Sequence, residues 1–488
     1  MKISKQAKFL LLSGLALVFF VQSCKDYRVE PSRLTTHEFD SNVFLRWNEL
    51  FLELDRYAKG YRPGPAPRAL GYLGLSAYHS VVAGMPNNNS LENYIPGLDV
   101  PEADAEADYH WPTCVNESYA YLMTRFFFHM ENEYPDLFQK IEQTREQLNN
   151  EFALETTPEI FERSKAFGQS VAAAVYEWEK LDLPGHNAFL TPQPDSYSPP
   201  QGPGLWQPTF PDFNKAMFPY WGDVRTFAMK DADKLAKPPI PYSEDSSSLF
   251  YHQALEVFNT VNFIHNYDPN NTAQAALAYE LKWIAIFWSD DILNYTFAPP
   301  PRLIAIANQV VDIEKIDLGE AAELYAKMGL ALSDAGVATW LSKYHYNVER
   351  PVSYIRRVVA KNTPAAANWK TILDNPYTGF QGMTPAFPAY PSGHSAFGGA
   401  GGKILSSFFE YNSNHPGTYN FTDLCHQDRT DFPDNTNTPR TFSSFKDLAN
   451  EDAYSRIPLG VHFRMDCDEG LRLGELAAQR VLELPWKK

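Results

Sequence analysis

Eight stretches of this 488-residue chain repeat apolar residues at the spacing of an amphipathic helix, and this periodicity restricts the fold more than any other feature. Strand-like alternation of polar and apolar residues is scarce by comparison. With 44% hydrophobic residues, the chain can bury one large core or two ordinary ones. The sequence therefore predicts an all-α protein. The expected helices cover residues 43–62, 67–85, 118–134, 158–180, 271–292, 318–346, 395–411 and 468–484.

A proline-rich segment, residues 183–242, divides these helices into two groups. It contains LPGHNAFLTPQPDSYSPPQGPGLWQPTFPDF, through which no helix can continue. Its aromatic residues favour a packed loop over a flexible linker, namely Trp206, Phe210 and Phe213. We expect two helical bundles, an N-terminal half over residues 24–182 and a C-terminal half over residues 243–488.

The first residues resemble an export signal. The basic sequence MKISKQAK precedes the apolar stretch FLLLSGLALVFFV (residues 9–21), which is too short to span a membrane comfortably. The sequence VQSC at residues 21–24 resembles a bacterial lipobox, which implies a signal peptide over residues 1–23 and a lipid on Cys24. An ordinary signal peptide cut near Ser23 is the alternative. We expect a lipid-anchored protein outside the inner membrane of a Gram-negative bacterium, periplasmic or on the cell surface, with the lipid as its only membrane attachment.

Charge and cysteine content exclude several classes of function. The net charge of −17 gives a nucleic-acid partner no electrostatic support. Besides Cys24 the chain has Cys114, Cys425 and Cys467, and no CxxC spacing suggests a zinc site. A disulfide between Cys425 and Cys467 is possible in an exported protein, but the sequence does not decide it.

The stretch FPAYPSGHSAFGGAGG (residues 387–402) places His394 at the start of a glycine-rich helix. Glycines at such a position let two helices pack closely. The amides exposed at a helix start also attract anions, and glycine lets the backbone approach a ligand. This segment alone does not decide between packing and anion binding.

Charged residues on both sides of this stretch favour the anion site. Upstream, Lys343 and Arg350 are seven residues apart, which is about two helical turns, so both cations could face one side of a helix. Pro351 indicates that this helix breaks at Arg350. Downstream, SRIPLGVHFRMD (residues 455–466) contains an arginine, a histidine and an aspartate. Because His462 and Asp466 are one helical turn apart, the carboxylate could orient the imidazole.

Together these segments resemble the three-part signature of the type 2 phosphatidic-acid phosphatase and vanadium haloperoxidase superfamily. The signature reads K-x6-R-P, then P-S-G-H, then S-R-x5-H-x3-D, and every position is filled. The matching residues are Lys343, Arg350, Pro351, Pro391, Ser392, Gly393, His394, Ser455, Arg456, His462 and Asp466.

The resemblance implies a pocket for a tetrahedral oxyanion, either phosphate or vanadate. Three cations would bind it, Lys343, Arg350 and Arg456. The Ser392 hydroxyl and the Gly393 amide would complete the set of donors. By resemblance, His462 bonds the central atom and is the metal ligand in a vanadium enzyme, while His394 on the opposite side is the acid–base group.

Features outside the signature favour the haloperoxidase branch. FPAYPSGHSAFGGA and DAGVATWLSKYHYNVERP resemble the fungal-type chloroperoxidase, in which Trp340 and Phe387 would form an apolar wall beside the halide. A further segment, residues 287–310, resembles one with a tryptophan followed by an aspartate, here Trp288 and Asp291, and the aspartate would support the arginines or His394. Ser395 speaks against the algal bromoperoxidase type.

The resemblance implies a vanadate-dependent peroxidase that oxidises iodide, bromide or chloride with hydrogen peroxide to hypohalous acid. In this reading Lys343 and both histidines are catalytic, and phosphate can occupy the same site. One alternative is an exported acid phosphatase that forms a phosphohistidine at His462; another is a non-catalytic surface-binding lipoprotein. Glu349, beside Arg350, is expected to face solvent. The sequence leaves open the halide, the organic acceptor and the oligomeric state.

Overall fold

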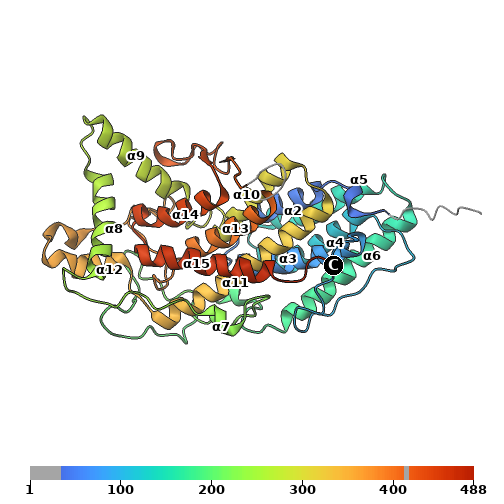
Figure 1. Ribbon diagram of the computed structural model, residues 1–488, viewed down its shortest axis with the longest axis horizontal. Helices are drawn as coiled ribbons and strands as arrows, with labels where there is room; N and C mark the ends of the chain where they lie inside the picture. Colours follow the sequence, from blue (N-terminus) through green and yellow to red (C-terminus); the bar gives the residue numbers. More distant parts are fainter. Residues whose placement is uncertain (1–33, 411–416) are drawn as a thin grey trace, which may run out of the picture. The chain divides into compact units, whose positions relative to one another are not determined.

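A computed structural model describes residues 34–410 and 417–488 of the chain, and residues 35–488 form one compact unit. The signal peptide and Cys24 predicted above lie outside the described residues. The prediction of an all-α fold is confirmed, because helices dominate Figure 1 and the described residues contain one small sheet of two short antiparallel strands.

The helices follow one another with few long interruptions. The N-terminal group is α2 (Asn42–Tyr57), α3 (Pro65–Val81), α4 (Trp111–Phe126), α5 (Pro135–Phe152) and α6 (Pro158–Lys180). The C-terminal group is α8 (Leu249–Asn266), α9 (Thr272–Phe287), α10 (Pro299–Glu314), α11 (Leu318–Tyr346), α13 (Gly393–Phe409), α14 (Phe445–Leu459) and α15 (Arg464–Leu482). Two short helices, α7 (Asp231–Lys234) and α12 (Pro351–Arg357), and strands β1 (Phe421–Asp423) and β2 (Arg440–Phe442) complete the regular structure, apart from single turns of 3₁₀ helix.

All eight helices predicted from periodicity are present: α6 and α11 have the predicted ends, and the other six have shifted ends. The segment expected over residues 118–134 is α4, which begins seven residues earlier because Pro112 suits a first helical turn. Four long helices were not predicted: α5, α8, α10 and α14. The three consecutive prolines that open α10 read as a helix breaker in sequence, but in the first turn they remove no hydrogen bond.

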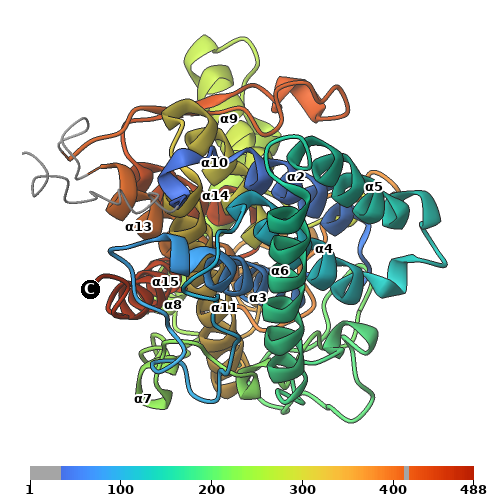
Figure 2. The ribbon, with the colours of Figure 1, turned by 90° about the vertical axis from the view of Figure 1, so that its right-hand side faces the viewer.

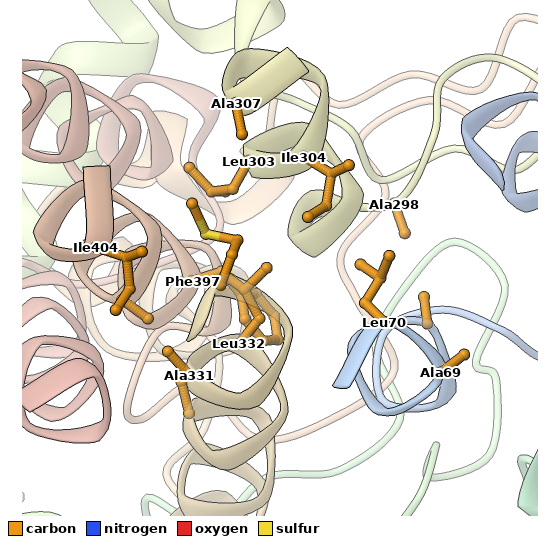
Figure 3. Close-up of a cluster of buried hydrophobic side chains, with 14 of the residues drawn as sticks. Ala69, Leu70, Ala298, Leu303, Ile304, Ala307, Ala331, Leu332, Phe397 and Ile404 are labelled. Carbon is orange, nitrogen blue, oxygen red and sulfur yellow. The ribbon is translucent and has the colours of Figure 1, made fainter. Parts of the chain in front are cut away.

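Helix α11 joins the two groups of helices. It is buried along most of its length and packs against α3 of the N-terminal group and against α13 and α15 of the C-terminal group. Figure 3 shows Leu70 of α3, Leu303 and Ile304 of α10, Leu332 of α11 and Phe397 of α13 meeting in one buried cluster. Figure 2 shows α6 against α3 and α4. The predicted halves therefore share a core, and their boundaries at residues 182 and 243 stay predictions.

The proline-rich segment is ordered and packs onto the C-terminal group. Trp206 is fully buried, and its backbone N–H donates to the carbonyl of Asn347 over 2.7 Å. The prediction of a packed loop is therefore confirmed for Trp206. It is wrong for Phe213, which is 62% exposed.

Cys114, Cys425 and Cys467 are free thiols, so the disulfide left open by the sequence is not formed in the structure. Among the described helices, none combines the length and the apolar character needed to cross a bilayer.

Candidate oxyanion site

The three signature segments meet at the beginning of α13. Ser392 is the N-cap of this helix, and its hydroxyl oxygen accepts a hydrogen bond from the N–H of Ser395 over 3.3 Å. The Ser392 N–H donates to the carbonyl of Asp466 over 2.8 Å, which joins the second segment to the third. The N–H of Gly393, the first helical residue, has no acceptor within the helix, so it can serve a ligand.

The glycines of α13 also serve packing. A Cβ on Gly399 would lie 2.6 Å from the carbonyl oxygen of Leu471 in α15, so only glycine allows this close approach of two helices. The packing interpretation is therefore confirmed, and the anion-binding interpretation stays a prediction. The helix start carries donors, and the glycines that follow hold α13 against α15.

Arg350 lies at the N-cap of α12 and is fully buried. Its Nε donates to the Phe387 carbonyl over 2.9 Å, and its Nη1 donates to the Val461 carbonyl over 3.0 Å. Nη1 also lies 3.2 Å from His462 Nε2. The remaining nitrogen, Nη2, is buried without a hydrogen-bond partner among the described residues.

Arg456 is the second fully buried guanidinium. Its Nη1 donates to the Trp288 carbonyl over 3.0 Å, and its Nη2 donates to Asp291 Oδ2 over 2.6 Å, while its Nε has no partner in the described part of the chain. Asp291 Oδ2 also lies 3.9 Å from His394 Nε2. The carboxylate thus stands between the arginine and the histidine, as the resemblance implied.

The hydrogen bonds of His462 define which of its nitrogens is protonated. A guanidinium can only donate, so His462 Nε2 accepts from Arg350 and carries no hydrogen. The hydrogen is therefore on Nδ1, which donates to Asp466 Oδ2 over 3.0 Å. The same carboxylate oxygen accepts from the Phe463 N–H over 2.9 Å. Asp466 thus selects the tautomer that leaves a lone pair on Nε2, and a central atom would take the place of Arg350 at this lone pair.

Lys343 does not stand free beside the anion site. Its ammonium donates to the carbonyls of Pro388, Ala389 and Pro391 over 3.0, 3.0 and 2.5 Å, which uses all three of its hydrogens. The lysine therefore anchors the loop that leads into Ser392. A contact with a bound oxyanion requires one of these three hydrogen bonds to be exchanged.

Burial and neighbouring positive charges disfavour the protonated forms of the two histidines in the site. Burial and the neighbouring cations Arg456 and Lys343 lower the pKa of His394 well below its ordinary value. Burial, Arg350 and Lys343 do the same to His462. Both imidazoles are neutral at pH 7 as a result. Burial raises the pKa of Asp466 to about 7, against the opposing effect of the Phe463 N–H and Lys343.

A cavity of about 390 Å³ opens beside these groups. Gly393, His394 and His462 are among its lining residues, and most of its lining surface is apolar. Trp340 and Phe387 both line it, with ring centroids 5.0 Å apart. The two aromatic residues predicted to flank a halide therefore lie together beside the oxyanion donors.

Two expectations from the sequence were wrong. Lys343 and Arg350 do not share a helix face, because α11 ends at Tyr346 and Asn347 takes a left-handed conformation (φ 50°). The turn brings the two cations together instead. Glu349 does not face solvent. It is 3% exposed, and its carboxylate accepts from Arg357 Nη2 over 2.7 Å, which directs it away from the anion donors.

Sequence reasoning missed most of the cavity wall. This wall comes from loops distant in sequence, and no spacing rule connects them. The additional lining residues include Lys59, Arg62, Gln193, Met217, Asp290, Ile292, Leu293, Leu373, Met383 and Thr384. Of these residues, only Asp290 could have been suspected from the sequence, because it is next to Asp291.

The donors present fit a tetrahedral oxyanion. Among the described residues, Arg350 Nη2, Arg456 Nε and His394 Nε2 are buried nitrogens without hydrogen-bond partners, and such groups are costly to leave unpaired. Arg350 and Arg456 are buried guanidinium groups, so an anion that pairs with them offsets the cost of burying their charge. The Gly393 N–H and the Ser392 hydroxyl add neutral donors. Vanadate and phosphate both offer the acceptor oxygens that these groups lack.

Comparison with known proteins agrees with this geometry. Residues 323–485 match the second helical-bundle domain of vanadium chloroperoxidases. The chain is 26% identical over 334 residues to the vanadium chloroperoxidase of Curvularia inaequalis, covering 58% of this chain. It spans half the length of that relative.

Solved structures match over a larger share of the chain. A bacterial vanadium-dependent iodoperoxidase superposes with a TM-score of 0.74 at 26% identity, covering 93% of this chain and 98% of the other. A bacterial vanadium-dependent chloroperoxidase superposes with a TM-score of 0.58 at 15% identity, covering 91% and 98%, which shows a common fold. Residues 323–485 are therefore similar to the second helical-bundle domain of vanadium chloroperoxidases, and the fold of the chain as a whole is similar to that of a bacterial vanadium-dependent iodoperoxidase.

Proposed function

We propose that the protein is a vanadate-dependent haloperoxidase, which oxidises halide with hydrogen peroxide to hypohalous acid. The observation that carries this proposal is the set of buried, unpartnered nitrogens on Arg350, Arg456 and His394 beside an apolar cavity. Similarity to an iodoperoxidase and to chloroperoxidases supports the same reaction class.

Each residue of the site has a distinct part in this reaction. Arg350 and Arg456 would hold vanadate by its charge, with the Ser392 hydroxyl and the Gly393 N–H as further donors. His462 would be its protein ligand through Nε2. Bound vanadate supplies a Lewis acid that activates hydrogen peroxide without changing oxidation state.

His394 is placed to act as the acid–base group of the reaction. Its Nε2 is buried, unpartnered and neutral, so it can accept a proton from hydrogen peroxide and return it to the departing oxygen. The overall reaction, halide plus hydrogen peroxide plus one proton, gives hypohalous acid plus water. Trp340 and Phe387 offer the halide a weakly hydrated surface, where it sheds water before it reacts.

The test uses signal-free protein loaded with orthovanadate and supplied with peroxide and iodide, bromide or chloride in separate assays. We expect peroxide-dependent halogenation that fails in phosphate buffer and in His462→Ala. Iodide is the easiest of the three halides to oxidise and chloride the hardest, so the series measures oxidising power. Phosphate release from a simple ester, blocked by vanadate and without any halogenation, would instead make the protein a phosphatase.

We further infer that the mature protein is exported and lipid-anchored through Cys24. The supporting observation is the short apolar stretch followed by VQSC. Radiolabelled palmitate should enter the wild-type protein and not Cys24→Ser. Labelling of both proteins, or of neither, would contradict the anchor. Protease treatment of intact cells then separates the periplasmic from the cell-surface location.

A further inference from the structure

Two methionines lie on the wall of the cavity in which a hypohalous acid would be formed. Met217 comes from the proline-rich segment and Met383 from the loop that precedes α13, and both line the cavity together with His394 and His462. Neither is fully buried. No part of the proposed reaction requires a thioether, so the mechanism leaves their presence unexplained.

The other methionines are protected. Of the eight methionines in the described part of the chain, the six outside this cavity are at most 8% exposed. They are Met85, Met123, Met130, Met229, Met328 and Met465. Two methionine side chains therefore line the cavity, and the other six are buried in the core.

Both cavity methionines are held in place by their backbones. The Met217 N–H donates to the Ala386 carbonyl over 2.9 Å, and its carbonyl accepts from the Tyr344 hydroxyl over 2.6 Å. The Met383 N–H donates to the Leu373 carbonyl over 2.8 Å. Their side chains pack against the hydrophobic core at the edge of the cavity. The backbone of each methionine is therefore fixed beside the cavity.

We propose that Met217 and Met383 are modification sites, at which the hypohalous acid formed in the cavity oxidises the protein's own thioethers to sulfoxides and so limits its working life. The proposal rests on the proposed function, because that reaction supplies the oxidant. It goes beyond that function because it names the residues that the hypohalous acid attacks before it leaves the cavity, and the effect of this attack on activity.

The chemistry balances with hypohalous acid and water as the only reagents. The sulfur lone pair attacks the halogen, hydroxide leaves, and water then adds its oxygen to sulfur as halide departs. The net reaction converts thioether and hypohalous acid into sulfoxide, halide and one proton. Sulfur loses two electrons and the halogen gains them.

The product changes the cavity wall. A sulfoxide oxygen is a strong hydrogen-bond acceptor, and in an apolar wall water has to satisfy it. Water retained near Trp340 and Phe387 keeps the halide hydrated. We therefore expect oxidised protein to show a raised KM for halide, while the oxyanion donors, which lie on other residues, still bind vanadate.

The first experiment maps oxidation by residue. Vanadate-loaded protein turns over iodide and peroxide without an organic acceptor, and digested samples are weighed by mass spectrometry for one added oxygen per methionine peptide. We expect oxidation at Met217 and Met383 to rise with the number of turnovers, while the six core methionines stay reduced. Equal oxidation of all eight, or none at the two cavity positions after many turnovers, would overturn the proposal.

Two control reactions separate this proposal from the proposed function. Peroxide without iodide should leave both cavity methionines reduced, which excludes direct oxidation by peroxide. If no iodide is oxidised in the main reaction, the proposed function fails. In that case, hypobromous acid added to the protein still tests whether the cavity methionines are the preferred targets. Preferential oxidation of Met217 and Met383 would support the proposed sites, and uniform oxidation of all eight methionines would refute them.

The second experiment tests the consequence. The double variant Met217→Leu, Met383→Leu replaces each thioether with a side chain of similar volume that does not form a sulfoxide. Activity over time is expressed relative to each protein's own starting rate. We expect the double variant to complete several-fold more turnovers than wild type, and Met229→Leu, a core control, to match wild type. Equal lifetimes of all three proteins would show that these sulfoxides have no effect on working life.

Discussion

His462 donates a hydrogen bond from Nδ1 to Asp466 Oδ2 over 3.0 Å, and Arg350 donates to the other imidazole nitrogen. This pair of contacts holds the Nε2 lone pair toward the oxyanion donors. Carboxylates that orient a ligating histidine in this way affect metal affinity without touching the metal.

Asp466→Asn should therefore weaken vanadate binding. The amide can donate as well as accept, so it no longer selects the Nδ1–H tautomer of His462. We expect the vanadate concentration for half-maximal activity to rise by roughly 10- to 100-fold. Asp468→Asn changes an exposed carboxylate on the same helix and serves as the control. Identical vanadate dependence in Asp466→Asn and wild type would show that Asp466 has no role in orienting His462.

Lys343→Met should destabilise the fold as well as reduce activity. Loss of the ammonium leaves the carbonyls of Pro388, Ala389 and Pro391 without their donor in a buried site. We expect a loss of roughly 3 kcal/mol or more in the free energy of unfolding, measured with urea. Lys446→Met, which changes an exposed lysine, should lie close to wild type. A stable Lys343→Met protein that has only lost activity would argue for a free lysine that contacts the anion alone.

Glu349 should make the stability of the protein depend on pH. Burial raises its pKa to about 7, while Arg357 opposes the shift. A carboxyl whose pKa is higher in the folded than in the unfolded state stabilises the fold at low pH. That contribution is lost as pH rises through about 7.

Glu349→Gln removes this titration and keeps an acceptor for Arg357. Relative to this variant, wild type should lose on the order of 2 to 3 kcal/mol of unfolding free energy between pH 5 and pH 8. Urea titrations of both proteins at the two pH values measure the difference. A constant difference between the proteins would mean that Glu349 ionises normally in the fold.

Phe387→Ala should affect the halide more than the oxyanion. The ring of Phe387 packs against Trp340, and its loss admits water to the wall where the halide is expected. We expect the KM for bromide to rise by about tenfold, equivalent to about 1.4 kcal/mol, with a smaller effect on the more weakly hydrated iodide. Phe213→Ala, at an exposed position, provides the comparison. A uniform fall in kcat with unchanged KM for both halides would place Phe387 outside the halide path.

The sequence predicted the helical class and the residues that meet at the oxyanion site. Periodicity was sufficient for long amphipathic helices, and three short motifs identified both arginines and both histidines. It failed for α10, where three prolines look like a break, and for Glu349, whose burial depends on Arg357 eight residues away. Helical spacing also gave the wrong reason for the meeting of Lys343 and Arg350.

The cavity wall could not be predicted from the sequence. Its residues come largely from the loop between α2 and α3, the proline-rich segment, the loop after α9 and the loop before α13, which approach only through tertiary packing. No local sequence pattern shows whether an apolar residue such as Met217 lines a cavity or lies in the core. The residues of the three motifs could therefore be identified from the sequence, while the cavity beside them could not.

In the proposed reaction, His462 and the buried arginines hold vanadate as the cofactor of halide oxidation. The most direct measurement is the rate of iodide oxidation by peroxide as orthovanadate is titrated into metal-free protein. Wild type should be inactive without vanadate and rise to a saturating rate, with phosphate competing for the same site, while His462→Ala should stay inactive throughout. Iodide oxidation that is independent of vanadate, or equal in His462→Ala, would contradict this account.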